Sequence, residues 1–156
     1  MSCAKDTPGV KENLRKSCSN QKRAAIIGRP PNMPTVMVVL GATGDLMTKK
    51  IVPALYHLYR QGQLPKLFQV VGFARRPWTT ADFRKQVGII LKTHAQDPVD
   101  KSHLQKFLDK FSYQAGKFEE AADYTALATE LGHIDGTWRV CANKLFYLAV
   151  PPDYYK

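Results

Sequence analysis

Apolar residues lie along the chain in two alternating patterns, short continuous runs and stripes with helical spacing. The continuous runs at residues 35–40, 68–74 and 145–150 are typical of strands buried on both faces of a parallel sheet. A weaker short strand is predicted at residues 113–115. Residues 1–33 show no periodicity and end near Pro30-Pro31, so we expect a disordered basic tail there and a folded domain at residues 34–156.

Stripes of helical spacing separate the apolar runs. Met47, Ile51, Leu55 and Leu58 recur at intervals of three or four residues and predict a helix that ends near Gly62. Pro53 within this stripe requires either a kink or a regular helix that begins near Ile51. Further helices are predicted at residues 79–91, 104–111 and 119–131, with a turn at Asp135-Gly136.

Strands that alternate with helices define the fold class. This order predicts βαβ units and therefore an α/β fold, a doubly wound (Rossmann-type) parallel sheet with helices on both faces. Because the chain stops a few residues after a predicted core strand, we expect this sheet to be incomplete.

The charge and composition of the chain indicate which kinds of molecule it is expected to bind. The net charge is +10, but the basic tail contains no aromatic residue that could stack on a base, so we expect an anionic small molecule and no nucleic acid. No apolar run reaches the roughly 18–20 residues of a membrane span, and the tail lacks the apolar segment of a secretory signal. We therefore expect no membrane partner and a cytoplasmic location, although a basic tail with serines leaves an organellar transit peptide open. The cysteines lack metal-ligand spacing, so no metal site is predicted.

A glycine motif, Gly41-Ala42-Thr43-Gly44-Asp45-Leu46, connects the first predicted strand to the first helix. Gly41 permits a tight turn off the strand, and Gly44 allows the backbone to approach a pyrophosphate at the helix N-terminus. The motif departs from G-x-G-x-x-G, because Met47 occupies the third glycine position. A glycine turn without a ligand therefore stays open as an alternative.

The end of the second strand indicates which cofactor is bound. NAD-preferring folds place an acidic residue there for the ribose 2′-hydroxyl, whereas this chain continues into Arg75-Arg76-Pro77. A guanidinium suits a 2′-phosphate by charge and by bidentate geometry. We therefore predict NADP as the cofactor; the alternative is that the two arginines only solvate a loop.

These motifs, taken together, resemble the glucose-6-phosphate dehydrogenase family over residues 34–156. The further landmarks that carry the resemblance are Lys49-Lys50, Pro53-Ala54-Leu55-Tyr56, Gly72-Phe73-Ala74-Arg75-Arg76, Ala81-Asp82-Phe83-Arg84, Ser112-Tyr113-Gln114-Ala115-Gly116 and the run from Asn143 to Pro152. Met47 stands where the family usually has alanine.

The resemblance implies how NADP would be held. Gly41, Ala42, Thr43, Gly44, Asp45 and Leu46 would bind its phosphates, Arg75 would meet the 2′-phosphate beside Arg76, and Tyr155 would lie beside the nicotinamide ribose. The position of Asp45 in the first helical turn separately predicts that its carboxylate caps backbone N–H groups there.

The resemblance also implies hydride transfer from C1 of glucose 6-phosphate to the nicotinamide. In the family, the segments that bind the sugar phosphate and supply the catalytic histidine follow later than residue 156, so we predict no catalytic residue here. Glucose 6-phosphate would be bound through that missing part, in an enzyme that is a homo-oligomer at full length. The four histidines match no catalytic motif and are expected to be surface or packing residues.

Two alternatives stay open from the sequence. One is a different NADP-dependent reductase or epimerase with a Gly-Ala-Thr-Gly loop. The other is a non-catalytic dinucleotide-binding module.

Overall fold

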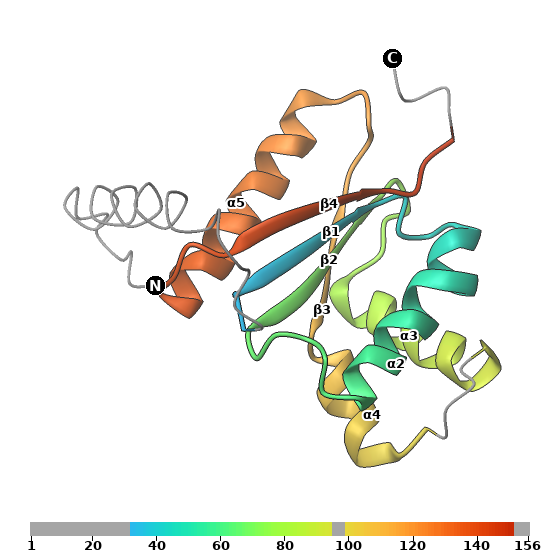
Figure 1. Ribbon diagram of the computed structural model, residues 1–156. Helices are drawn as coiled ribbons and strands as arrows, with labels where there is room; N and C mark the ends of the chain where they lie inside the picture. Colours follow the sequence, from blue (N-terminus) through green and yellow to red (C-terminus); the bar gives the residue numbers. More distant parts are fainter. Residues whose placement is uncertain (1–31, 95–98, 152–156) are drawn as a thin grey trace, which may run out of the picture.

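The computed structural model describes residues 32–94 and 99–151, which form a parallel sheet covered by helices (Figure 1). The strands are β1 (Thr35–Leu40), β2 (Phe68–Ala74), β3 (Phe111–Ala115) and β4 (Asn143–Leu148), in the spatial order β3-β2-β1-β4. All neighbouring strands pair in parallel. The predicted α/β doubly wound sheet is therefore confirmed. The predicted tail lies almost entirely outside the described residues.

The helices cover both faces of the sheet. They are the π-helical segment η1 (Met47–Ile51) and helices α2 (Val52–Arg60), α3 (Thr80–His94), α4 (Lys101–Leu108) and α5 (Ala121–Trp138). Figure 1 shows α2, α3 and α4 on one face and α5 on the other. The chain adds β2 and β3 on one side of β1 and then returns to add β4 on the other side. This reversal moves the crossover helix α5 to the opposite face and creates a topological switch point between β1 and β4.

Alternate residues of β1 connect the two layers of the core. Met37 and Val39 pack in a cluster with α2, α3 and α4, whereas Val36 and Val38 pack in a second cluster with α5. Each of these four side chains is at most 8% exposed. Burial on both faces explains why β1 is a continuous apolar run in the sequence.

Pro53 is accommodated by a change of helix type. The backbone N–H of Val52 donates to the carbonyl of Met47, five residues earlier, so the turn before Pro53 is π-helical. Helix α2 then begins at Val52 with Pro53 in its first turn, where a missing N–H costs little. Of the two predicted alternatives, the regular helix that begins near Ile51 is confirmed.

The predicted turn at Asp135-Gly136 was wrong, because α5 continues to Trp138. The Asp135 carboxylate accepts hydrogen bonds from the backbone N–H of Ala142 and from Lys144 Nζ, so it links the helix to β4. The helix ends at Arg139, which adopts the left-handed conformation with φ of 53°.

The predicted burial of the last strand was also wrong. Leu145, Phe146, Tyr147 and Leu148 are 38–53% exposed. Strand β4 pairs with β1 on one side and, within residues 32–94 and 99–151, with no strand on the other. An edge strand that no described element covers exposes side chains on both faces, whatever their hydrophobicity.

Helix α3 begins with reciprocal hydrogen bonds between Thr79 and Asp82. The Asp82 carboxylate accepts from the Thr79 backbone N–H at 2.9 Å, and Thr79 Oγ1 accepts from the Asp82 N–H at 3.2 Å. The hydrogen bonds from the Thr79 backbone and hydroxyl lower the pKa of Asp82 below 3.8. The carboxylate therefore stabilises the folded chain wherever it is ionised.

We expect Asp82→Ala to lower the melting temperature at neutral pH. A pKa that is depressed in the folded state contributes stability that is present above the unfolded value of 3.8 and is lost as the pH falls through the folded value. The difference in melting temperature between the wild type and Asp82→Ala should therefore shrink in acid, as measured by circular dichroism. Glu119→Ala, which removes a carboxylate without an ion pair to any described residue, is the control; a difference of constant size at every pH would contradict the capping role.

Candidate dinucleotide site

The carboxyl ends of all four strands meet at one open pocket of about 250 Å³. Its lining comes from the loop after β1 (Gly41, Thr43, Gly44), the loop after β2 (Ala74, Arg75, Arg76), the segment after β3 (Phe118) and the end of β4 (Ala149, Val150, Pro151). The pocket includes the switch point between β1 and β4, where doubly wound sheets bind ligands.

The loop after β1 makes a turn that only glycine accommodates at its first position. Gly41 has φ of +87°, and its N–H donates to the carbonyl of Phe73 on β2 at 2.8 Å. A Cβ added at Gly41 would lie 2.2 Å from the carbonyl oxygen of Ala149. Any side chain at residue 41 would therefore collide with the backbone at the end of β4.

The second glycine of the loop is less closely enclosed than Gly41. A Cβ added at Gly44 would meet only the Gly41 carbonyl oxygen, at 3.3 Å. Helical structure begins at Asp45, and the first N–H groups of a helix have no partner within it. The backbone N–H of Thr43 likewise donates to no described residue. The loop therefore presents unpaired donors and the positive end of a helix to the pocket.

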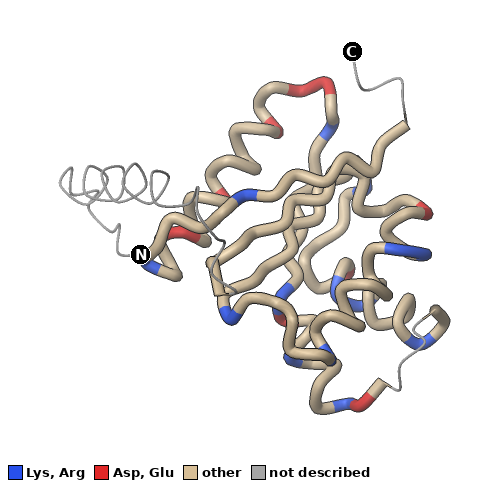
Figure 2. Tube along the Cα trace, viewed as in Figure 1, with Lys and Arg blue, Asp and Glu red and all other residues tan. Residues whose placement is uncertain are grey.

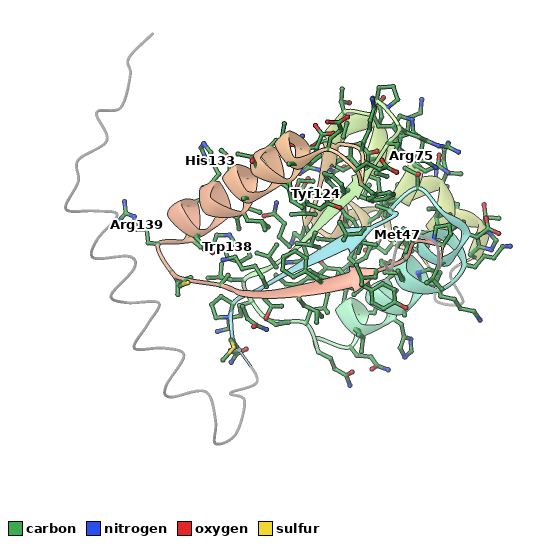
Figure 3. All side chains as sticks on the ribbon, turned by 90° about the horizontal axis from the view of Figure 1, so that it is seen from above. Met47, Arg75, Tyr124, His133, Trp138 and Arg139 are labelled. Atoms are coloured by element: carbon green, nitrogen blue, oxygen red, sulfur yellow. The ribbon has the colours of Figure 1, made fainter. Side chains whose placement is uncertain are left out.

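The loop after β2 contributes two arginines that differ in their contacts. The Arg76 guanidinium lies over the Trp78 ring, 5.1 Å from its centroid. Arg75 is exposed and forms no hydrogen bond or ion pair with the residues that the structure describes. Figure 3 shows Arg75 at the end of the sheet opposite to His133, Trp138 and Arg139. The described lining residues include no acid, so the pocket carries a net positive charge.

Three other predicted site residues, Ala42, Asp45 and Leu46, do not line the pocket. Ala42 is buried, and its Cβ lies 2.9 Å from where a Cβ on Gly72 would be. Leu46 is exposed and does not line the pocket. Tyr155 lies outside the described residues.

Asp45 does not have the capping role that the sequence suggested. Its side chain is 86% exposed and forms an ion pair with Lys49 at 2.8 Å. The hydrogen bond and the charge of Lys49 lower the pKa of Asp45. The pairing offsets a negative charge that would otherwise oppose a bound phosphate.

Sequence reasoning missed Phe118, which forms the wall after β3. Its ring packs against Phe73, with centroids 5.8 Å apart, and its carbonyl accepts a hydrogen bond from the Tyr124 hydroxyl at 3.0 Å. Phe118 could have been suspected only from its position, three residues after the end of β3, which the sequence predicted as a weak strand. The four histidines are exposed, which selects the surface role over the packing role, and none lines the pocket.

The described part of the chain lacks a metal-binding cluster and a membrane-spanning helix. No group of His, Cys, Asp or Glu side chains there could hold a metal ion. No helix there has both the length and the apolar character needed to cross a membrane. Figure 2 shows the basic residues of the described chain scattered over several elements, whereas a nucleic-acid interface is typically a basic patch or stripe.

A glycine turn, a helix start and unpaired arginine charge around one pocket at the carboxyl edge of a parallel sheet define a dinucleotide-binding domain. The chain belongs to the glucose-6-phosphate dehydrogenase family, because the model of that family's NAD binding domain matches residues 38–156. Membership of this family decides against a different reductase or epimerase.

Individual relatives agree with the family assignment. The chain is 37% identical over 129 residues to the glucose-6-phosphate 1-dehydrogenase of Chlamydia muridarum, covering 81% of this chain and 25% of that protein. It is 38% identical over 119 residues to the Schizosaccharomyces pombe enzyme, covering 76% and 24%. A solved glucose-6-phosphate dehydrogenase in complex with glucose 6-phosphate matches with a TM-score of 0.73 and 32% identity, over 83% of this chain and 27% of that one. The chain thus spans about a quarter of the length of these relatives.

Proposed function

We propose that this pocket binds NADP in preference to NAD. The observation that carries the proposal is the unpaired Arg75 guanidinium at the carboxyl end of β2, in a pocket whose described lining contains no acid. An acidic residue at that position would accept the ribose 2′-hydroxyl of NAD and repel a 2′-phosphate. Arginine instead donates two parallel hydrogen bonds to a phosphate.

The other predicted site residues would bind different parts of the same NADP molecule. The segment from Gly41 to Leu46 would hold the pyrophosphate, with Thr43 and Gly44 supplying donors and close approach. The end of β4, with Tyr155, would lie beside the nicotinamide ribose. We assign this role to residues 34–156 and no part of it to residues 1–33.

The whole protein, of which this chain matches about a quarter, would oxidise glucose 6-phosphate. The hydride leaves C1 of the sugar for the nicotinamide, and the proton of the C1 hydroxyl passes to a base, which yields a lactone and NADPH. This support comes from the relatives, which are glucose-6-phosphate 1-dehydrogenases. A cytoplasmic location and a homo-oligomeric whole enzyme stay predictions from the sequence.

Isothermal titration of the full chain with NADP and with NAD tests the cofactor preference. A charge-assisted pair with the 2′-phosphate should make NADP bind about ten- to a hundred-fold more tightly. Adenosine 2′,5′-bisphosphate, which carries the 2′-phosphate without the nicotinamide, should compete with NADP. Equal affinities, or tighter binding of NAD, would refute the proposal.

A further inference from the structure

The hydroxyl of Tyr113 lies beneath the arginine loop and holds it at two points. Tyr113 is on β3, and its side chain is buried. The single proton of this hydroxyl is shared between two carbonyl oxygens, that of Ala74 at 3.0 Å and that of Arg76 at 2.8 Å from the phenol oxygen. These two carbonyls flank Arg75 in the chain, so one hydroxyl fixes the backbone on both sides of that residue.

The Trp78 ring supports the same loop from the side. It packs against the Tyr113 ring, with centroids 6.1 Å apart, and lies under the Arg76 guanidinium. The backbone N–H of Trp78 also donates to the Arg76 carbonyl at 2.8 Å. The Arg76 side chain is thereby engaged by an aromatic face, which leaves Arg75 as the guanidinium free to meet an anion.

Tyr113 is itself well anchored. Its backbone N–H donates to Thr80 Oγ1 at 3.1 Å, at the start of α3, and its ring packs against Phe83. Burial raises the pKa of Tyr113 to about 12, although the charge of Arg76 opposes the shift. The phenol therefore stays protonated, and able to donate, throughout the neutral range.

We infer that Tyr113 is a positioning residue for recognition of the 2′-phosphate. Its hydroxyl holds the backbone around Arg75 in one conformation, so binding does not have to order the loop. The inference rests on the proposed function, in which Arg75 meets the 2′-phosphate. The effect should appear with NADP and not with NAD, because NAD has no group for Arg75 to bind.

Tyr113→Phe tests the inference, since it removes the oxygen and keeps the ring. We expect the affinity for NADP to fall by about three- to ten-fold and the affinity for NAD to stay within about two-fold. Tyr56→Phe is the matched control: it also removes a buried tyrosine hydroxyl, but one without a hydrogen-bond partner in the described structure. The control should leave both affinities unchanged, and each titration is run well below the melting temperature of its variant.

A double variant separates positioning from a general structural role. In an Arg75→Ala background, Tyr113→Phe should cause no further loss of NADP affinity, because the hydroxyl acts through Arg75. A Tyr113→Phe variant that keeps the full NADP preference, or that weakens NADP and NAD equally, would overturn the inference. If Tyr113→Phe does not fold, Trp78→Phe takes its place, and an unchanged NADP preference in that variant would equally overturn it. Failure of the proposed function looks different, because the wild type itself would then show no preference for NADP.

Discussion

Arg75→Ala is expected to weaken NADP binding by about ten- to a hundred-fold while leaving NAD binding nearly unchanged. The guanidinium contributes only when a 2′-phosphate is present, and Arg75 has no described partner whose loss would disturb the fold. The neighbouring arginine is the natural control. Because Arg76 lies over Trp78, Arg76→Ala should cost NADP affinity less than Arg75→Ala does.

Isothermal titration of both variants with both cofactors measures this difference. If Arg75→Ala weakened NAD as much as NADP, Arg75 would be acting on the fold or on the phosphates common to both cofactors. If Arg76→Ala had the larger effect, the assignment of the 2′-phosphate to Arg75 would be wrong.

The sequence predicted the buried strands well because burial on both faces leaves a local signature. Strands β1 and β2 have the predicted bounds, and their side chains pack in both core clusters. The last strand has the same apolar signature but lies at the edge of the sheet that the described residues form, where Phe146 is 53% exposed. The apolar pattern of a segment predicts that it forms a strand with apolar side chains, but it does not show which other elements cover that strand.

The same distinction applies to the site. The glycine turn and the arginines lie within short segments, so their chemistry could be predicted from neighbouring residues alone. Phe118 joins the pocket only because β3 lies beside β2, and Tyr113 meets Arg76 across 37 residues of sequence. Contacts of this kind depend on strand order and register, which the hydrophobic pattern does not specify.

Substitution of the two glycines in the loop after β1 should affect different properties: stability at Gly41 and cofactor affinity at Gly44. Gly41→Ala is expected to destabilise the folded chain by about 3 kcal/mol, because φ of +87° disfavours a side chain and the new Cβ would lie 2.2 Å from the Ala149 carbonyl. Relief of this clash requires β1 and β4 to separate, since the atom it meets is backbone. The loss should be visible as a lower melting temperature without any cofactor present.

Gly44→Val, although it adds a larger side chain, should change stability by no more than about 1 kcal/mol. A Cβ at residue 44 meets only the Gly41 carbonyl, at 3.3 Å, and otherwise points into open space. That space is where the pyrophosphate would approach the helix start, so the valine should weaken NADP and NAD alike by at least about ten-fold. Thermal melts and titrations of the same two proteins measure both effects. If Gly44→Val bound both cofactors normally, the pyrophosphate would have to lie elsewhere, and the loop would be a turn that serves the fold alone.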